Sequence, residues 1–485
     1  MDARSTVRRG GLVSTLAAWS IASVTILTAT GDMRLVDAAR WQDAAAVRSL
    51  LAQGVDVNEP QGDGATPLHW AAYWGELDTV GLLVRSGADA NATDDLGVTP
   101  LALACGNGDA GMVEALLNAG ADPSTTAPSR PPALMLCART GNLQAVRQLL
   151  ARGADVNATE PSRSQTALMW AVAQRHPDVV RELTARGADV HARTQVTSRF
   201  VNIADPNDDL TIVAGTVPHG GSTPLLFAAR QGALASARLL IAAGADVNDT
   251  AADGTSVIVT AAHSGHGTLA RFLVEAGADP DHDAAGYTAL HAAVVRGDHA
   301  LVDVLVAHGA DMNTRVTRGT PVTRGGRDFV LPHNLIGATP FLLASKFLEL
   351  DVVRALAARR ADPDISLADG TTPLMVAAGL LSEPGLFDRR GRITVPRPVT
   401  EERARQLVEL LRNGGASVTA VNQQGDTALH GAAIHGYLGV VDVLVKWGAR
   451  LDAANRDGHT PLDVAVGSEM VTLLRALGAA RQAGR

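Results

Sequence analysis

Hydrophobic and polar positions recur along this chain with a period close to 33 residues. Within one period, residues 66–75 form a short apolar run that opens on Thr-Pro and ends at a glycine. Residues 77–87 carry a second apolar stripe that also ends at a glycine, and the polar stretch 89–97 follows. Threonine is a good N-cap, proline suits the first helical position, and glycine ends helices in the left-handed conformation. The pattern predicts two short helices followed by a hairpin-like connection.

Two short phrases mark the period along almost the whole chain. The first is Gly-Ala-Asp or Gly-Val-Asp, with its glycines at Gly54, Gly87, Gly120, Gly153, Gly187, Gly244, Gly277 and Gly309. The second is Thr-Pro-Leu or a close variant, with its threonines at Thr66, Thr99, Thr166, Thr223, Thr288, Thr339, Thr372, Thr427 and Thr460. A fixed period of this size indicates a solenoid, in which stacked neighbours bury the apolar faces that one unit cannot bury alone.

The length and wording of this unit resemble the ankyrin repeat, and the resemblance covers roughly residues 33–480. It implies an all-α fold, an ankyrin-repeat solenoid of about 12 helix-turn-helix units with β-hairpin connections and three insertions. Residues 32–485 are expected to form this single array. Within this family, the chain resembles the long, insertion-bearing, exported ankyrin-repeat proteins of bacteria. The resemblance also implies a binding scaffold whose hairpins and inner helices line a concave groove.

Composition narrows the expectations for core and partner. Of 485 residues, 46% are apolar and only 3% are aromatic, so the core is expected to consist of Ala, Leu and Val. The formal net charge of −8 argues against general affinity for nucleic acid, and we expect no nucleic-acid partner.

Residues 1–31 do not fit the array. Arg4, Arg8 and Arg9 precede an uncharged, apolar stretch that ends in small residues, which is the layout of a secretory signal. The stretch is also long enough to remain as a membrane anchor. We therefore expect a signal peptide or N-terminal anchor, and an exported protein that is periplasmic, extracellular or anchored in the inner membrane. The alternative of a buried N-terminal helix is disfavoured, and the Ala- and Arg-rich composition is typical of bacteria.

Several candidate chemical sites are set aside. Residues 106–111 match the dinucleotide-binding pattern of glycines, but they neither follow a strand nor open a βαβ unit. The repeat's own histidines are expected to tie backbone groups together, at His69, His291 and His430. Three asparagines match the glycosylation pattern but also belong to the ordinary hairpin wording, namely Asn91, Asn157 and Asn248. We predict no catalytic residues, no metal site and no cofactor.

The two cysteines, Cys105 and Cys137, fall on the inner helices of adjacent units, one position out of phase. Export would permit a disulfide, but helix axes about 8–10 Å apart would strain it. Buried free thiols are the favoured interpretation.

Three insertions interrupt the period. Residues 190–221 and 314–337 both lie in a hairpin connection and contain runs typical of strands, at 199–203 with 210–213 and at 328–331. Extended hairpins or ordered flaps are expected there. Residues 381–399 lie between the two helices of one unit, and Thr400 is then expected to cap an outer helix over 401–412. Decorative loops are the alternative, although long loops in compact arrays are usually functional.

The last turn of each inner helix supplies the candidate partner-binding residues. They are Tyr73, Trp74, Arg139, Arg230, Gln231, His263, Arg296, Lys346, Phe347 and His435. None of the 22 equivalent positions is acidic, and residues 314–337 carry four arginines against one aspartate, a net charge of +3. A mildly basic groove would favour an anionic partner.

These observations predict a monomeric, non-catalytic scaffold that binds a protein partner through the groove. Membrane contact is expected only through an uncleaved N-terminal segment. Two alternatives stay open: an enzyme or enzyme accessory with a site formed by the hairpin insertions, and a structural protein of an envelope assembly.

Overall fold

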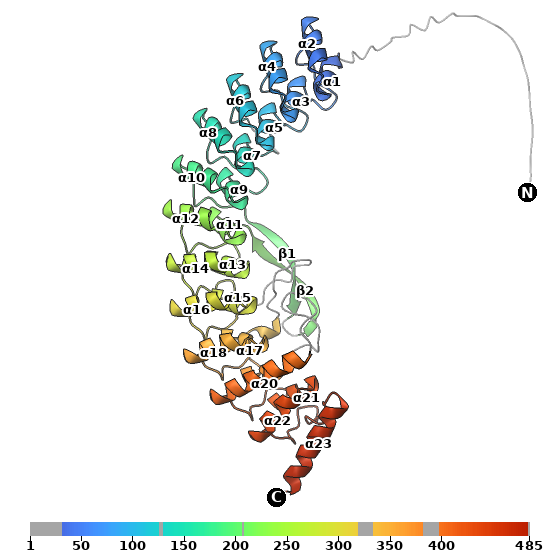
Figure 1. Ribbon diagram of the computed structural model, residues 1–485, viewed down its shortest axis with the longest axis vertical. Helices are drawn as coiled ribbons and strands as arrows, with labels where there is room; N and C mark the ends of the chain where they lie inside the picture. The colour runs from blue at the N-terminus through green and yellow to red at the C-terminus, as the bar shows by residue number, and fades with distance from the viewer. Residues whose placement is uncertain (1–31, 126–129, 206–207, 319–332, 382–396, 484–485) are drawn as a thin grey trace, which may run out of the picture.

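The fold is a curved array of helix pairs stacked along one axis (Figure 1). The computed structural model describes residues 32–125, 130–205, 208–318, 333–381 and 397–483. Within these residues eleven helix pairs follow one another, and a terminal helix closes the C-terminal end. This agrees with the all-α solenoid of about 12 units that the sequence predicts.

Each pair consists of an inner and an outer helix. The inner helices are α1 (Arg34–Arg40), α3 (Pro67–Trp74), α5 (Pro100–Asn107), α7 (Ala133–Thr140), α9 (Ala167–Ala173), α11 (Pro224–Gln231), α13 (Val257–His263), α15 (Ala289–Arg296), α17 (Pro340–Lys346), α19 (Pro373–Ala377) and α21 (Ala428–His435). The outer helices are α2 (Ala44–Ala52), α4 (Leu77–Arg85), α6 (Ala110–Asn118), α8 (Leu143–Ala151), α10 (Pro177–Ala185), α12 (Leu234–Ala242), α14 (Gly267–Glu275), α16 (His299–Ala307), α18 (Leu350–Ala358), α20 (Arg397–Asn413) and α22 (Leu438–Lys446), and α23 (Ser468–Ala483) is terminal.

The core runs continuously through the array between the two rows of helices. Small alanines such as Ala71 and Ala104 are fully buried on the inner helices and allow neighbouring helices to approach closely. Leucines and valines of the outer helices, for example Leu83, Val113 and Leu116, close the other side of the core. Each unit thus completes the apolar face of its neighbour, as a solenoid requires.

Asparagine side chains link successive hairpin connections. The Asn58 amide donates to the carbonyl oxygen of Gly87 (3.1 Å), and its side-chain oxygen accepts from the backbone N–H of Asp89 (2.8 Å). The same pair of bonds recurs from Asn91, Asn157 and Asn248. These last three residues match the glycosylation pattern, and each amide nitrogen is engaged with the next unit.

The histidines of the repeat link units in a second way, as the sequence predicts. The backbone N–H of Thr66 donates to His69 Nδ1 (3.1 Å), and His69 Nε2 donates to the Val98 carbonyl oxygen of the next unit (2.9 Å). His291 and His430 repeat both contacts. Burial lowers the pKa of His69 and lowers that of His291 from 6.5 to about 4, so these rings are neutral at pH 7.

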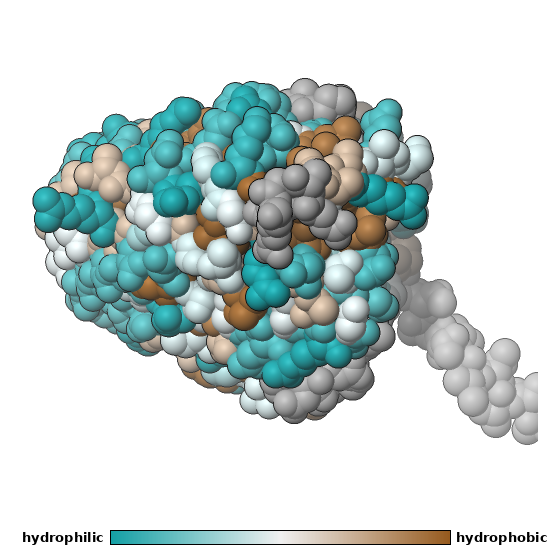
Figure 2. All heavy atoms as spheres, turned by 90° about the horizontal axis from the view of Figure 1, so that it is seen from below, coloured by the Kyte–Doolittle hydropathy of each residue, from teal (hydrophilic) through white to brown (hydrophobic). Residues whose placement is uncertain are grey.

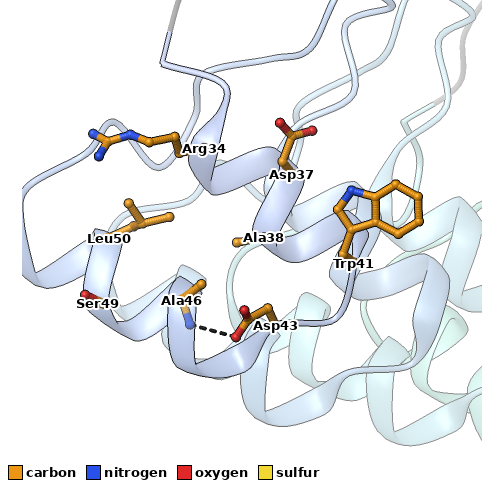
Figure 3. A pocket seen from close by; sticks show the side chains of 8 residues that line it. All are labelled: Arg34, Asp37, Ala38, Trp41, Asp43, Ala46, Ser49 and Leu50. Carbon is orange, nitrogen blue, oxygen red and sulfur yellow. Dashed lines mark hydrogen bonds between the residues drawn. The ribbon is translucent and has the colours of Figure 1, made fainter.

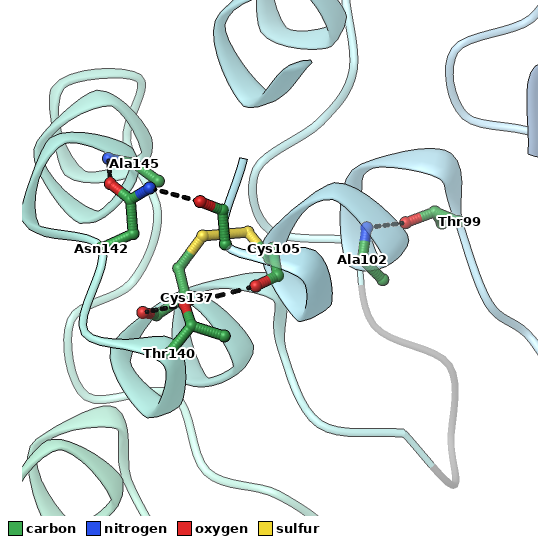
Figure 4. The surroundings of a disulfide bond; sticks show 8 residues. Thr99, Ala102, Cys105, Cys137, Thr140, Asn142 and Ala145 are labelled. Carbon is green, nitrogen blue, oxygen red and sulfur yellow. Dashed lines mark hydrogen bonds between the residues drawn. A yellow bond between two sulfur atoms is a disulfide. The ribbon is translucent and has the colours of Figure 1, made fainter. Parts of the chain in front are cut away.

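Cys105 and Cys137 form a disulfide (Figure 4). The sequence-based preference for free thiols is therefore wrong. The two Cα atoms lie 4.5 Å apart, within the range that a disulfide spans. The mean spacing of helix axes is a poor guide here, because α5 and α7 place these two positions directly opposite each other (Figure 4).

The first insertion forms a two-stranded antiparallel hairpin that projects on the inner-helix side of the array (Figure 1). Strand β1 (Thr197–Asp205) pairs with β2 (Asp208–His219), and Ile203 lies opposite Val213. This confirms the strands expected at 199–203 and 210–213. At the base of the hairpin, Gly220 has φ +108°, and a Cβ there would lie 2.0 Å from the Gln195 carbonyl oxygen, so no larger residue fits.

The other two insertions are described only in part. The strand-like run 328–331 and most of 381–399 lie outside the described residues. Val316, at the start of the second insertion, is buried and its N–H donates to the Ala338 carbonyl oxygen. Helix α20 begins at Arg397 rather than after Thr400, so Thr400 is not its cap; helical structure extends back through Pro398, which is compatible with an early helical position.

Across the described residues, no helix is both long enough and apolar enough to span a bilayer. The segment 1–31 lies outside them, and its expected role as signal or anchor stays a prediction.

The glycines that end the outer helices adopt left-handed backbone, as predicted. Gly244 has φ +96°, with nothing within 4 Å of a Cβ added there. Arg360 takes the equivalent position with φ +67°, a conformation that costs a non-glycine residue about 1 kcal/mol.

We expect Gly244→Val to lower the free energy of unfolding by about 1 kcal/mol or more, through backbone strain alone. Arg360→Gly should be neutral or stabilising, because it removes the same strain. Thermal melting of both variants tests this pair. A stabilised Gly244→Val together with a destabilised Arg360→Gly would contradict the assignment of these residues as helix caps.

The neutral His291 ring also predicts a pH dependence. The folded pKa of about 4 lies below the ordinary 6.5, so the unfolded chain binds the proton more readily between these values, and stability falls as pH falls. Denaturant unfolding at pH 7 and pH 4.5 should show the parent losing about 2 kcal/mol more than His291→Gln, which keeps a side-chain acceptor without titrating. Equal losses in the two proteins would show that this ring does not resist protonation in the fold.

Candidate functional site

The ten candidate partner-binding residues lie at the C-terminal ends of the inner helices, along one side of the array (Figure 1). Four of them are exposed, namely Tyr73, Trp74, Arg139 and Arg230. The other six are half-buried, namely Gln231, His263, Arg296, Lys346, Phe347 and His435. Only part of the predicted set is therefore openly accessible, and its role in partner binding stays a prediction.

Some of these residues also hold neighbouring units together. Lys346 Nζ donates to the Leu381 carbonyl oxygen, one unit further on. The indole N–H of Trp74 donates to the Arg40 carbonyl oxygen (3.0 Å), and Tyr287 Oη lies 3.0 Å from His263 Nδ1. Because Lys346 serves a contact within the array, it is a weaker candidate for partner binding than Arg230.

Basic side chains from separate parts of the chain meet at the base of the β1–β2 hairpin. Arg163, Arg199, His219 and Arg230 gather there, and we call them the basic cluster. All four are exposed. The backbone N–H of Gln195 donates to the Arg163 carbonyl oxygen (2.8 Å), which places the connection containing Arg163 beside the start of the hairpin.

Strand register puts two members of the cluster on one face of the hairpin. Thr197 lies opposite His219, and Arg199 lies opposite Val217. Side chains two apart on a strand share a face, so Arg199 and His219 are diagonal neighbours on it. Arg230 reaches the cluster from the end of α11, with its guanidinium 5.8 Å from the centre of the Phe227 ring.

His219 experiences the positive charge of all three arginines of the cluster. Partial burial lowers the pKa of His219, and the charges of Arg199, Arg230 and Arg163 lower it further, whereas Asp253 acts in the opposite direction. Partial desolvation also lowers the pKa of Arg230, although its side chain keeps contact with solvent. Arginine stays protonated regardless, so the cluster carries three fixed positive charges, with the negative charge of Asp253 nearby, and a histidine whose pKa is lowered by burial first and by these charges second.

Arg193, close by, has a different role. Its guanidinium pairs with Asp249 and donates to the carbonyl oxygens of Gly221 (2.9 Å) and Thr250 (2.8 Å). These contacts anchor the hairpin base to the following unit.

Counting residues along each inner helix could not find Arg163, Arg199 and His219, because they lie in connections. The charge of the region does indicate a basic surface in the sequence, because residues 126–199 hold 10 Arg and 5 Asp or Glu, a net charge of +5. Once the strand register of the hairpin is known, the alternation of side chains between the two faces of a strand places Arg199 and His219 on the same face.

The arrangement of the basic cluster is suited to binding anionic groups. Within the part of the chain that the structure describes, no group of three His, Cys, Asp or Glu side chains is placed to hold a metal ion. Clustered guanidinium groups recognise carboxylates and phosphates, often in a bidentate way.

Comparison with known families decides the identity of the array. The model of the family "Ankyrin repeats (3 copies)" matches residues 35–127, 121–194, 225–316 and 400–481, which is more than half of the chain. This chain belongs to the ankyrin-repeat family. Two internal segments of the chain, 195–224 and 317–399, are not matched by the family model. The first contains the β1–β2 hairpin, and the second contains most of the other two insertions. Helices α17, α18 and α19 nevertheless lie in the second segment and keep the repeat's helix arrangement.

Individual relatives match parts of this ankyrin array. NF-kappa-B inhibitor alpha of Sus scrofa is 36% identical over 164 residues, which are 34% of this chain and 43% of that protein. Human ankyrin repeat and SOCS box protein 16 is 29% identical over 197 residues, 37% of this chain and 40% of that protein. The chain thus spans about two fifths of the length of these relatives. The solved ankyrin repeat domain of human ASB11 is 27% identical, with a TM-score of 0.41, covering 49% of this chain and 96% of that one.

Ankyrin arrays are scaffolds for protein–protein interaction, and this functional class applies to the chain. Family members are generally non-catalytic. Family membership does not identify the binding surface or the partner, so both are inferred below from the geometry of this chain.

Proposed function

We propose that this ankyrin-repeat protein is a non-catalytic scaffold whose basic cluster binds an acidic segment of a protein partner. The carrying observation is the positive field that Arg163, Arg199 and Arg230 share at the hairpin base. Arg139 extends this surface toward the N-terminus, with its guanidinium 5.6 Å from the centre of the Trp170 ring. Arginine and tryptophan are the usual anchors of protein interfaces.

The hairpin provides the reason why this place suits a partner. It projects from the array, so a bound segment can contact β1 on one side and the ends of the inner helices on the other. Arg193 and Gly220 fix its base, which keeps the cluster in place before binding. A preformed site loses less conformational entropy on binding than a flexible loop would.

The test is a charge reversal of Arg163→Glu, Arg199→Glu and Arg230→Glu in the full chain. A fluorescent deca-glutamate peptide should bind the parent and lose about tenfold or more in affinity on the variant, measured by anisotropy. Binding to the parent should weaken as salt is raised. A matched triple reversal at exposed arginines elsewhere, Arg271→Glu, Arg403→Glu and Arg475→Glu, controls for net charge.

Equal losses in the two triple variants would mean that only net charge matters, and the proposal for this site would fail. Circular dichroism and melting should stay unchanged in both variants, since all six positions are exposed. A turnover activity that disappears with the hairpin would instead favour an enzyme.

We also propose that the protein is exported, to the periplasm or beyond. Two observations support this: the arginine-rich, then apolar, layout of residues 1–31, and the disulfide between Cys105 and Cys137. Disulfides persist in oxidising compartments and are rare in the cytosol.

Residues 1–40 fused to a reporter that is active only outside the cytoplasm should yield activity in a bacterial host. Replacing Arg4, Arg8 and Arg9 with Glu should reduce that activity strongly, because the positive n-region is required for targeting. A fusion that is well expressed and inactive would rule out a signal in this segment.

A further inference from the structure

The acidity of this chain is concentrated in its first three units. Residues 32–125 hold 14 Asp or Glu and 4 Lys or Arg, a net charge of −10. Residues 126–485 hold 35 of each sign, a net charge of zero. The field of the N-terminal units is therefore opposite to that of the basic cluster.

Exposed aromatic side chains gather in the same units. The chain has 6 Trp, 3 Tyr and 7 Phe, and four of these 16 residues lie close together, one just after α1 and three on α3. They are Trp41, Trp70, Tyr73 and Trp74, and we call them the aromatic patch. Trp41 is 74% exposed, Tyr73 and Trp74 are each 46% exposed, and Trp70 is half-buried.

The rings of the patch are held in fixed positions. Tyr73 packs edge-to-face against Trp70 (5.9 Å between ring centres) and against Trp74 (4.8 Å). The indole N–H of Trp70 donates to Gln61 Oε1 (3.1 Å), and that of Trp74 donates to the Arg40 carbonyl oxygen. The patch is thus preorganised, which lowers the entropy cost of binding.

The patch already receives a cation from its own chain. The guanidinium of Arg40 lies 5.4 Å from the centre of the Trp41 ring and 5.2 Å from that of Trp70. Both are cation–π distances. The geometry shows which kind of group these ring faces accept.

Carboxylates lie on the helix and the connections next to the patch. Asp37 lies four residues before Trp41, on the same side of α1, and Figure 3 shows both side chains pointing away from Arg34. Gln61, the acceptor for Trp70, donates to Asp63 (2.8 Å), and the Asp63 carbonyl oxygen accepts from the N–H of Asp95. Asp37, Asp63 and Asp95 are all exposed.

We infer that the aromatic patch is a second docking surface, which binds an arginine-rich segment of a partner polypeptide. Guanidinium groups stack on the exposed indole and phenol faces, and the surrounding carboxylates pair with their charge. An acidic segment would be repelled by the net charge of −10, and a purely apolar one would desolvate the carboxylates without compensation. This surface is distinct from the basic cluster and holds whether or not that cluster binds a partner.

The experiment uses the full chain and a fluorescent nona-arginine peptide at physiological ionic strength, read by anisotropy. Trp41→Ala with Tyr73→Ala should weaken binding by about tenfold or more, because two stacking faces are lost. Val421→Ala with Val466→Ala, which removes apolar surface that is 58% and 52% exposed at the other end of the array, is the matched control and should change nothing. Asp37→Asn with Asp95→Asn should weaken binding several-fold and reduce its salt dependence.

Three outcomes would overturn the inference. The first is no binding of nona-arginine to the parent. The second is equal binding to the parent and to the Trp41→Ala, Tyr73→Ala variant, which would reduce the effect to diffuse charge. The third is self-association of the parent that the same variant abolishes, because the occupant would then be a second copy of this chain. Two controls separate this result from that of the proposed function. Nona-glutamate should not bind through the patch. The triple reversal of the basic cluster should leave the binding of nona-arginine intact.

Discussion

Each unit of this protein is completed by the next one, and every other property of the fold depends on that. An apolar face of Ala, Leu and Val is buried only when a neighbour stacks on it. Polar groups follow the same logic: Asn58 satisfies backbone groups of the following unit, and His69 satisfies one as well. A chain with few aromatic residues can form a long continuous core in this way, because small side chains let the helices approach closely and large side chains are not needed to fill the space between them.

The same dependence explains where the array tolerates insertions. Units are joined by the Asn and His side chains, by the helix faces and by a backbone bond between successive hairpin connections, such as that from Asp95 to Asp63. The first insertion leaves that ladder almost intact, since Asn157 still bonds Gly187 and Asp189 before the hairpin begins. The array can therefore present β1 and β2 as an added element without losing the stacking of α9 on α11.

Sequence alone predicted most of this fold because the repeat fixes local structure and packing together. Threonine caps, left-handed glycines, the histidine ties and the strands of the first insertion follow from short patterns with direct physical causes. The disulfide did not follow, because it depends on the rotation of α5 against α7, which a mean axis distance does not contain. The start of α20 was also missed, since Thr400 is a good cap by type while the chain before it already adopts helical backbone.

The candidate site was less accessible to sequence analysis for a related reason. Positions counted along inner helices found Tyr73, Trp74 and Arg230, which are exposed, but also Lys346, which bonds to Leu381 within the array. Residues such as Arg163, Arg199 and His219 share a surface only because a hairpin base meets a neighbouring connection. That meeting depends on strand register, which has no periodic signature. The bond from Gln195 to Arg163 does recur between other hairpin connections, as from Asp95 to Asp63, but it does not show which side chains lie beside it.

The net charge of the units changes sign along the array. An acidic, aromatic N-terminal end is followed by units of net positive charge near the hairpin, and a rigid solenoid keeps the two regions at a fixed separation. On a flexible chain these opposite fields would attract each other and cancel; stacking prevents that, because every unit between them is held by its neighbours. A partner with one basic and one acidic segment could contact both regions only with its segments in matching order and spacing. The stiffness that comes from stacking would thereby act as a source of specificity, in addition to the chemistry of either surface.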